Sequence, residues 1–281
     1  MLTTVPVMLL AMTLVPLGDT AGKLMTAAGV APVFVASSRL GLGALILLPV
    51  KGALNRAPYS DPRVWLRAFL FAAVIVSIVT SQRTEPIANT FAALFTGPLL
   101  SYVLAVVFLG ERVTMARTVL LVLGFVGVLL VVRPGSDMSP GILYAVMAGV
   151  FYGGYLTMNR WLAGAYPGTS LLMSQLVIGV ILTTPLAITR LPDLDPYIAR
   201  LALLSAAASA LGNLLLIWCY GRAEATLLAP LVYFQLVAAT FFGWSVFGNW
   251  PDLVALAGFL LLIGAGVAGF LLRPHHNRTL R

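Results

Sequence analysis

Ten long apolar stretches fill almost the whole chain, and charged residues, prolines and glycines mark where they end. Each stretch holds roughly twenty mostly apolar residues, the length that a helix needs to cross a bilayer. Because 60% of the 281 residues are hydrophobic and only 9% are charged, a soluble core of this size could not bury the apolar surface. We expect an all-α membrane protein with transmembrane helices near 5–28, 31–50, 64–82, 86–109, 114–132, 140–160, 169–189, 197–220, 225–247 and 252–272.

The distribution of basic residues predicts how these helices are oriented. The formal net charge is +8, but Lys and Arg lie at the ends of apolar stretches instead of forming one stripe, which argues against a nucleic-acid-binding face. If the N-terminus is cytoplasmic, eleven basic residues, Arg67 among them, fall on the cytoplasmic side and four on the outer side. We expect a multi-pass protein of a bacterial inner (plasma) membrane with both termini cytoplasmic.

The two halves of the sequence resemble each other, at an offset that rises from 136 to 140 residues. Residues 1–135 and 136–281 are therefore predicted to be two five-helix repeats, and an odd number of spans inverts the second repeat. Inverted repeats are typical of secondary transporters, which bind solute between the halves near mid-membrane. The matches are Ser38-Arg39 with Ser174-Gln175, Pro49 with Pro185, Gly110 with Gly248, and Arg133-Pro134 with Arg273-Pro274.

Three charged residues lie inside predicted spans, where charge is costly and often functional. Asp19 and Arg39 are each ten residues from the turn near Gly29, so they should lie at similar depth. Lys23 is one helical turn from Asp19 in the favourable order for an ion pair, so we expect the three residues to form a cluster of one acid and two bases. One interpretation is a substrate site in which Arg39 or Lys23 attracts a carboxylate or phosphate, while Asp19 orients the base or exchanges a proton. The other is an ion pair that only fastens the first helix to the second.

The corresponding positions of the second half are polar but uncharged. At an offset of 136, Asp19, Lys23 and Arg39 align with Tyr155, Asn159 and Gln175. A cavity with one charged and one neutral wall would suit an amphipathic solute. Aromatic and amide side chains elsewhere in the spans could stack on a planar solute or serve only in packing; the candidates for the cavity are Phe95, Tyr102, Asn213, Tyr233 and Gln235.

Two prolines interrupt apolar stretches, Pro98 in the first half and Pro230 in the second. Proline frees a backbone carbonyl and permits a kink. We expect Pro98 and Pro230 to act as hinges, with ordinary kinks as the alternative.

Other classes of membrane protein lack their signatures here. The sequence has no phosphate-binding loop for ATP, no Gly-x-Ser-x-Gly and no His or Cys metal pattern, so we expect no enzyme activity, cofactor or metal. An intramembrane enzyme or a channel remains a more distant alternative. The expected partners are a small-molecule solute and the lipid bilayer, with no nucleic acid, and the chain should be a monomer or a homodimer.

Several motifs resemble those of the drug/metabolite transporter superfamily, in its ten-helix EamA-type family. They are Pro98-Leu99-Leu100, Phe108-Leu109-Gly110-Glu111-Arg112, Gly124-Phe125-Val126-Gly127-Val128, Arg133-Pro134-Gly135, Ala229-Pro230-Leu231-Val232-Tyr233-Phe234-Gln235-Leu236 and Phe247-Gly248-Asn249. The resemblance implies a central cavity between two halves and transport of amino acids, vitamins, nucleosides or other metabolites. The family often has a Glu where this chain has Asn249. We expect a carrier of an amino acid or of a planar or carboxylate-bearing solute that works by alternating access, with an importer of a vitamin such as riboflavin as the alternative.

Overall fold

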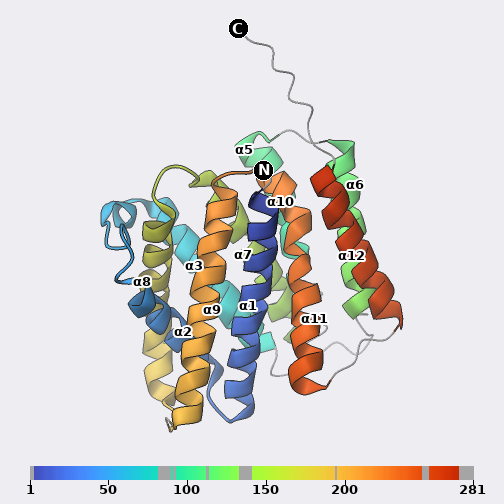
Figure 1. Cartoon of the computed structure of the whole chain (residues 1–281). Coiled ribbons are helices and arrows are strands. Elements are labelled where there is room, and N and C mark those ends of the chain that lie inside the picture. Colours follow the sequence, from blue (N-terminus) through green and yellow to red (C-terminus); the bar gives the residue numbers. More distant parts are fainter. Residues whose placement is uncertain are drawn as a thin grey trace.

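The described part of the chain is a bundle of helices (Figure 1). The computed structural model describes residues 3–81, 90, 93–111, 114–132, 141–193, 195–248 and 253–271. Its helices are α1 (Thr4–Ala27), α2 (Pro32–Leu47), α3 (Pro62–Ser81), α5 (Thr96–Leu109), α6 (Met115–Val132), α7 (Gly141–Trp161), α8 (Gly168–Ala187), α9 (Pro196–Tyr220), α10 (Ala225–Val232), α11 (Phe234–Phe247) and α12 (Leu253–Leu271), with 3₁₀ turns at Ala57–Ser60 and Ile188–Arg190.

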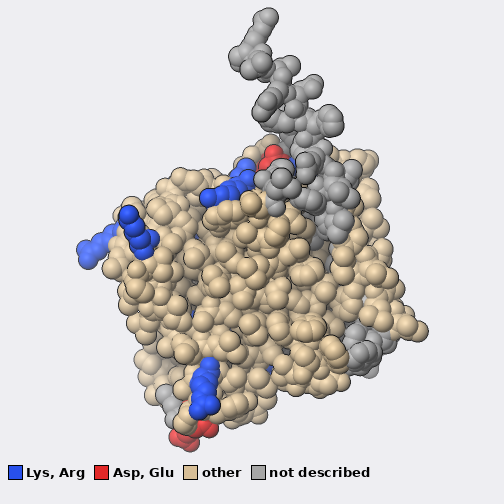
Figure 2. Space-filling model, in the orientation of Figure 1, with Lys and Arg blue, Asp and Glu red and all other residues tan. Residues whose placement is uncertain are grey.

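The helices follow the apolar stretches of the sequence, as expected for a multi-pass membrane protein. Within the described residues, five helical segments are long and apolar enough to cross a membrane: Thr4–Ala27, Gly141–Trp161, Gly168–Arg190, Pro196–Tyr220 and Leu227–Phe247. On the face shown in Figure 2, charged side chains gather near the two ends of the bundle and leave a broad, largely uncharged band between them. The predicted fourth span falls partly on residues 82–89 and 91–92, outside the described residues.

Helices that are distant in the sequence lie side by side in the bundle. Helix α1 packs against α9, α3 against α7, and α6 against α12, while α2 contacts both α8 and α9. Glycines allow α5 to approach α7 closely: a Cβ atom on Gly97 would lie 2.9 Å from the carbonyl oxygen of Gly149. Small residues at helix contacts are typical of membrane proteins, where close packing stabilises helix association.

Glycine ends two helices at matching positions of the halves. Gly110 follows α5 with a φ of 64°, and Gly248 follows α11 with a φ of 72°. Because a Cβ atom disfavours this left-handed conformation, glycine is the residue that closes a helix in this way. The sequence match between Gly110 and Gly248 therefore reflects the same backbone geometry at both positions.

Acidic side chains join several helices at one end of the bundle. Glu111 Oε1 accepts hydrogen bonds from Arg160 Nε, at 3.0 Å, and from the backbone amide of Ala225, also at 3.0 Å. Glu224, next to the start of α10, forms an ion pair with Arg117 of α6. Because backbone amides are unsatisfied at a helix start, carboxylates stabilise the N-terminus of α10. These contacts hold the ends of α5, α6 and α7 against the start of α10.

Candidate substrate site between the helices

Arg39 and Asp19 meet inside the bundle, as the spacing of the first two helices predicts. Arg39 Nη1 donates to Asp19 Oδ1 at 2.6 Å, Nε donates to Ser205 Oγ at 2.9 Å, and Nη2 donates to the carbonyl oxygen of Gly18 at 2.8 Å. Each guanidinium nitrogen thus has an acceptor, and one acceptor carries the opposite charge. The Arg39 side chain is 11% exposed and fastens α1, α2 and α9 together.

Lys23 does not complete the expected three-charge cluster. Its Nζ atom lies 4.4 Å from the centre of the Phe247 ring on α11, and within the described residues it forms no ion pair with Asp19. The predicted pairing of Asp19 and Lys23 was wrong for two physical reasons. The carboxylate is engaged by Arg39, and the lysine stem is long enough to place its ammonium over an aromatic face.

A second arginine, Arg67, is the largest polar side chain buried in the described bundle, with no exposed surface. Its Nε donates to Asn159 Oδ1 at 2.6 Å and its Nη1 to the carbonyl oxygen of Leu171 at 3.0 Å. The guanidinium carbon lies 5.3 Å from the centre of the Tyr155 ring. Nη2 has no hydrogen-bond partner among the described residues, and none of them supplies a carboxylate to Arg67.

The charge count assigned Arg67 to the cytoplasmic side as an orientation signal, and that interpretation was incomplete. Arg67 lies on α3 on the same helical face as Val64 and Phe71, which are buried or partly buried against the core. Residues three and four apart share a helix face, so the periodicity of α3 could have identified Arg67 as an inward-facing charge.

Two of the three residues of the predicted neutral wall, Tyr155 and Asn159, contact Arg67, and the third lies on α8, the helix of Leu171. Tyr155, Asn159 and Gln175 are all buried, the first two on α7 and the third on α8. Gln175 is one helical turn beyond Leu171, whose carbonyl binds Arg67. Asn159 Nδ2 and both polar atoms of the Gln175 side chain have no hydrogen-bond partner among the described residues. The wall predicted to be neutral therefore contains an arginine supplied by α3.

Tyrosines and amides connect this group to the rest of the bundle, and we call Tyr152, Tyr155, Asn213 and Gln235 the tyrosine-amide layer. The Tyr152 and Tyr155 rings are stacked, with centroids 6.4 Å apart. The Tyr155 hydroxyl donates to Asn213 Oδ1 at 2.9 Å, and the Tyr152 hydroxyl lies 3.4 Å from Gln235 Oε1. The structure thus brings residues of α7, α9 and α11 together in one polar layer inside an apolar bundle.

The remaining aromatic candidates form a separate cluster at two breaks in the helices. Phe95 precedes α5, and Tyr233 lies between α10 and α11. Their rings contact edge to face, with centroids 6.0 Å apart. Tyr102 is buried in the same apolar cluster, and its hydroxyl lies 2.8 Å from Thr118 Oγ1. These three residues belong to one apolar cluster and are not part of the tyrosine-amide layer.

The two candidate hinge prolines lie next to those breaks. Pro98 is in the first turn of α5, three residues after Phe95, and Pro230 is in α10, three residues before Tyr233. A proline in the first helical turn costs little, because the amide there has no intrahelical partner. The prolines themselves are at unequal positions, but the breaks at Phe95 and Tyr233 are 138 residues apart, the offset that relates Gly110 to Gly248.

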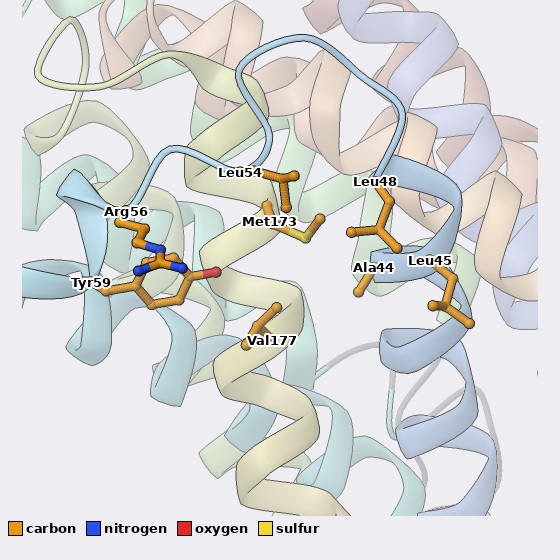
Figure 3. A pocket seen from close by; sticks show the side chains of 8 residues that line it. All are labelled: Ala44, Leu45, Leu48, Leu54, Arg56, Tyr59, Met173 and Val177. Carbon is orange, nitrogen blue, oxygen red and sulfur yellow. The ribbon is translucent and has the colours of Figure 1, made fainter.

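A surface cavity of about 560 Å³ lies apart from these groups, between α2 and α8 (Figure 3). Arg56 and Tyr59 lie at one side of it, and the rest of its lining is apolar: Ala44, Leu45, Leu48, Leu54, Met173 and Val177. Leu45 and Leu54 are more than half exposed, so the cavity opens on the outside of the bundle. It contains none of the predicted site residues.

Comparison with known proteins gives one family match for each half of the chain. The family model of EamA-like transporters matches the chain twice, over residues 2–133 and 139–272. The chain belongs to the EamA-like transporter family. A protein of known crystal structure matches over 95% of this chain and 98% of its own, with a TM-score of 0.79 at 17% sequence identity, so the two chains share one fold.

Curated relatives of this EamA-like protein are named as transporters of small molecules. An S-adenosylmethionine uptake transporter of Rickettsia bellii (strain RML369-C) is 29% identical over 82% of this chain and 81% of its own length. A riboflavin transporter of Brucella anthropi is 27% identical over 72% of this chain and 74% of its own. A pseudopaline exporter of Pseudomonas aeruginosa is 26% identical over 82% of each. The chain is therefore a small-molecule transporter embedded in a membrane.

Proposed function

We propose that this chain is a carrier for an amphipathic metabolite with a planar group, such as an aromatic amino acid or a nucleoside-like or flavin-like compound. The metabolite crosses a bacterial inner membrane by alternating access between two inverted five-helix repeats, residues 1–135 and 136–281. The single observation that carries the substrate class is the tyrosine-amide layer, in which Tyr152 and Tyr155 stack beside Asn213 and Gln235.

Mirrored helix contacts support the two-repeat architecture. The packing of α1 on α9 corresponds to that of α7 on α3, because each is the first helix of one half against the third helix of the other. The contact of α2 with α9 corresponds in the same way to that of α8 with α3. The double family match and the helix breaks at Phe95 and Tyr233 point in the same direction. Interrupted helices in both halves are typical of carriers whose site lies between repeats.

The ion pairs at one end of the bundle support a cytoplasmic gate. Under the positive-inside orientation, with both termini cytoplasmic, the bonds of Glu111 and Glu224 to Arg160, Ala225 and Arg117 lie on the cytoplasmic side. These bonds join helices of both halves. In a rocking mechanism they separate when the cytoplasmic side opens, and the breaks next to Pro98 and Pro230 absorb part of the movement.

The chemistry named for the relatives supports this substrate class. S-adenosylmethionine contains an adenine ring and an amino-acid group, and riboflavin contains a fused ring system. Aromatic side chains stack on such planar groups, and buried amides give them orientation through hydrogen bonds. Because one relative is named a riboflavin transporter, transport of a vitamin is the second candidate function for this chain.

A ligand screen on the purified protein tests the proposal. Thermal unfolding is measured with S-adenosylmethionine, riboflavin and the twenty standard amino acids, because a ligand of the folded state raises its apparent stability. Counterflow in proteoliposomes then tests transport of every ligand that stabilises the protein. Tyr155→Phe removes the hydroxyl bonded to Asn213 and should weaken binding about fivefold or more. Tyr102→Phe, outside the layer, is the matched control.

Three outcomes would contradict the proposal. They are the absence of any stabilising ligand in the screen, single-channel currents in place of saturable flux, and equal weakening of binding by Tyr102→Phe and Tyr155→Phe.

A further inference from the structure

Arg67 carries a positive charge that no described carboxylate balances. Its guanidinium has five N–H donors and stays charged at any physiological pH. Nε and Nη1 donate to two neutral oxygens, those of Asn159 and Leu171, and Nη2 has no partner among the described residues. A buried ion in an apolar bundle costs free energy unless an opposite charge balances it.

Two buried amides on the helices that bind Arg67 add further unsatisfied groups. Asn159 must present its oxygen to Arg67, so its Nδ2 donor is free to bind something else, and it has no partner among the described residues. The Gln175 side chain is completely buried and likewise has no described partner at either polar atom. Buried polar groups are nearly always hydrogen-bonded, so unsatisfied donors around a buried cation indicate an anionic ligand.

We call each buried arginine, with the residues that contact it, the Arg39 group and the Arg67 group. The Arg39 group shows which anion fits such an arrangement. By the repeat alignment, Asp19 corresponds to Tyr155 and Arg39 to Gln175 at an offset of 136. Ser205, which binds Arg39, corresponds to Arg67 at the later offset of 138. Both groups therefore hold one guanidinium among the first, second and third helices of the repeats. In the Arg39 group a carboxylate of the chain meets it, whereas the Arg67 group has a tyrosine at that position.

We propose that Arg67, Asn159 and Gln175 bind the carboxylate group of the transported molecule, an inference that rests on the proposed carrier function. Arg67 Nη2, Asn159 Nδ2 and Gln175 Nε2 supply donors to the two carboxylate oxygens, and the planar guanidinium suits carboxylate geometry. The Tyr155 ring lies against Arg67 and belongs to the tyrosine-amide layer. The substrate therefore extends from Arg67, where its carboxylate is bound, to Tyr155 and Tyr152, where its planar group stacks.

The burial of Arg67 fits an occluded conformation. Arg67 lies five residues from the start of α3, and Asn159 lies two residues from the end of α7, so the subsite is near one end of the bundle. A carboxylate reaches it when that end opens and is enclosed when the end closes, as alternating access requires.

Binding of acetate to the full-length purified protein tests the subsite without knowledge of the substrate. Thermal unfolding is measured in sodium acetate, sodium phosphate, sodium chloride and acetamide, with ionic strength held constant. Acetate should stabilise the wild type more than phosphate, chloride or acetamide, and Arg67→Gln should weaken its apparent affinity at least about tenfold. Arg39→Gln is the matched control and should keep the acetate effect.

Asn159→Asp provides a second variant that keeps Arg67 in place. It supplies the missing carboxylate from the chain itself, so the unliganded protein should become more stable and the acetate effect should disappear. Acetate that stabilises Arg67→Gln or Asn159→Asp as much as the wild type would overturn the subsite. Equal Arg67-dependent stabilisation by phosphate or chloride would overturn its assignment to a carboxylate.

A metabolite comparison separates failure of the subsite from failure of the carrier function. L-tryptophan is compared with L-tryptophanamide, which lacks the carboxylate, and S-adenosylmethionine with riboflavin. Loss of affinity in Arg67→Gln confined to the carboxylate-bearing ligands supports the subsite. In a second outcome, the protein binds and transports only riboflavin or L-tryptophanamide, and Arg67→Gln changes neither binding nor counterflow. That outcome would refute the subsite and leave the carrier function in place. An acetate effect that depends on Arg67, with no metabolite bound or transported, would refute the carrier function and leave the subsite.

Discussion

Two arginines lie inside the same apolar bundle and differ in the source of the opposite charge. Arg39 has a carboxylate from its own chain, that of Asp19, at 2.6 Å. Arg67 is more deeply buried and meets only neutral oxygens within the described structure. An arginine that is satisfied by the chain stabilises the fold, whereas one that is left with free donors is suited to binding a ligand. The predictions below test this difference, in order of expected effect.

Arg39→Gln should cause the largest loss of stability. The substitution leaves the Asp19 carboxylate without its partner and removes the donors to Ser205 and Gly18. Breaking a buried pair costs about 3–5 kcal/mol, and because Asp19 is 39% exposed we expect roughly 2–3 kcal/mol. Thermal unfolding of the purified variant measures the loss. An unchanged unfolding temperature would show that Arg39 does not fasten the helices.

Asp19→Asn should have a smaller effect and make Arg39 resemble Arg67. The neutral amide keeps an oxygen near Arg39 Nη1 but removes the charge, so the loss should be about 1–2 kcal/mol. Acetate should recover part of this stability, because it can replace the missing carboxylate. If acetate stabilises Asp19→Asn no more than the wild type, the two arginine groups are less alike than proposed.

Glu111→Gln tests an ion pair at the end of the bundle. Glutamine keeps an acceptor for the Ala225 amide but loses the charge that attracts Arg160 and favours the start of α10. We expect a loss of about 1 kcal/mol in stability and faster opening of that end. Accessibility of a cysteine introduced near the start of α10, measured by thiol labelling, reports the opening. Unchanged labelling would remove Glu111 from the proposed gate.

The pair of Asp61 and Arg63, whose arginine is about half exposed, provides a baseline with the smallest effect on stability. Hydrogen bonds from Arg63, supported by one from Tyr166, hold the pKa of Asp61 below its usual range. The stabilisation is therefore complete above the ordinary carboxyl pKa of about 4 and is lost as the pH falls through the lowered value. Arg63→Gln should lower stability slightly at pH 7 and flatten its decrease below pH 4, so that variant and wild type converge in acid, as followed by unfolding at a series of pH values.

The sequence predicted the helices well because their length and apolarity are local properties. The meeting of Asp19 and Arg39 was also predictable, since equal spacing from a helical turn places two residues at equal depth. The position of the Lys23 ammonium was not predictable, because its flexible stem places it over the Phe247 ring of a distant helix. Arg67 was overlooked because a basic residue near the end of a span also serves as a signal of orientation. Its neighbours on α7 and α8 are far away in the sequence, so only the folded chain brings them together.

Counterflow per folded protein, compared between Arg67→Gln and Arg39→Gln, tests the central claim most directly. Both variants are reconstituted at equal folded amounts, and the ligand is the carboxylate-bearing metabolite that most stabilises the wild type in the screen. We expect Arg67→Gln to fold normally and lose at least about 90% of the flux, because it lacks the charge-assisted bonds to the carboxylate. Arg39→Gln should be less stable but keep most of its flux per folded molecule. Full flux in Arg67→Gln, with flux lost in folded Arg39→Gln, would contradict the account and return the site to Asp19 and Arg39.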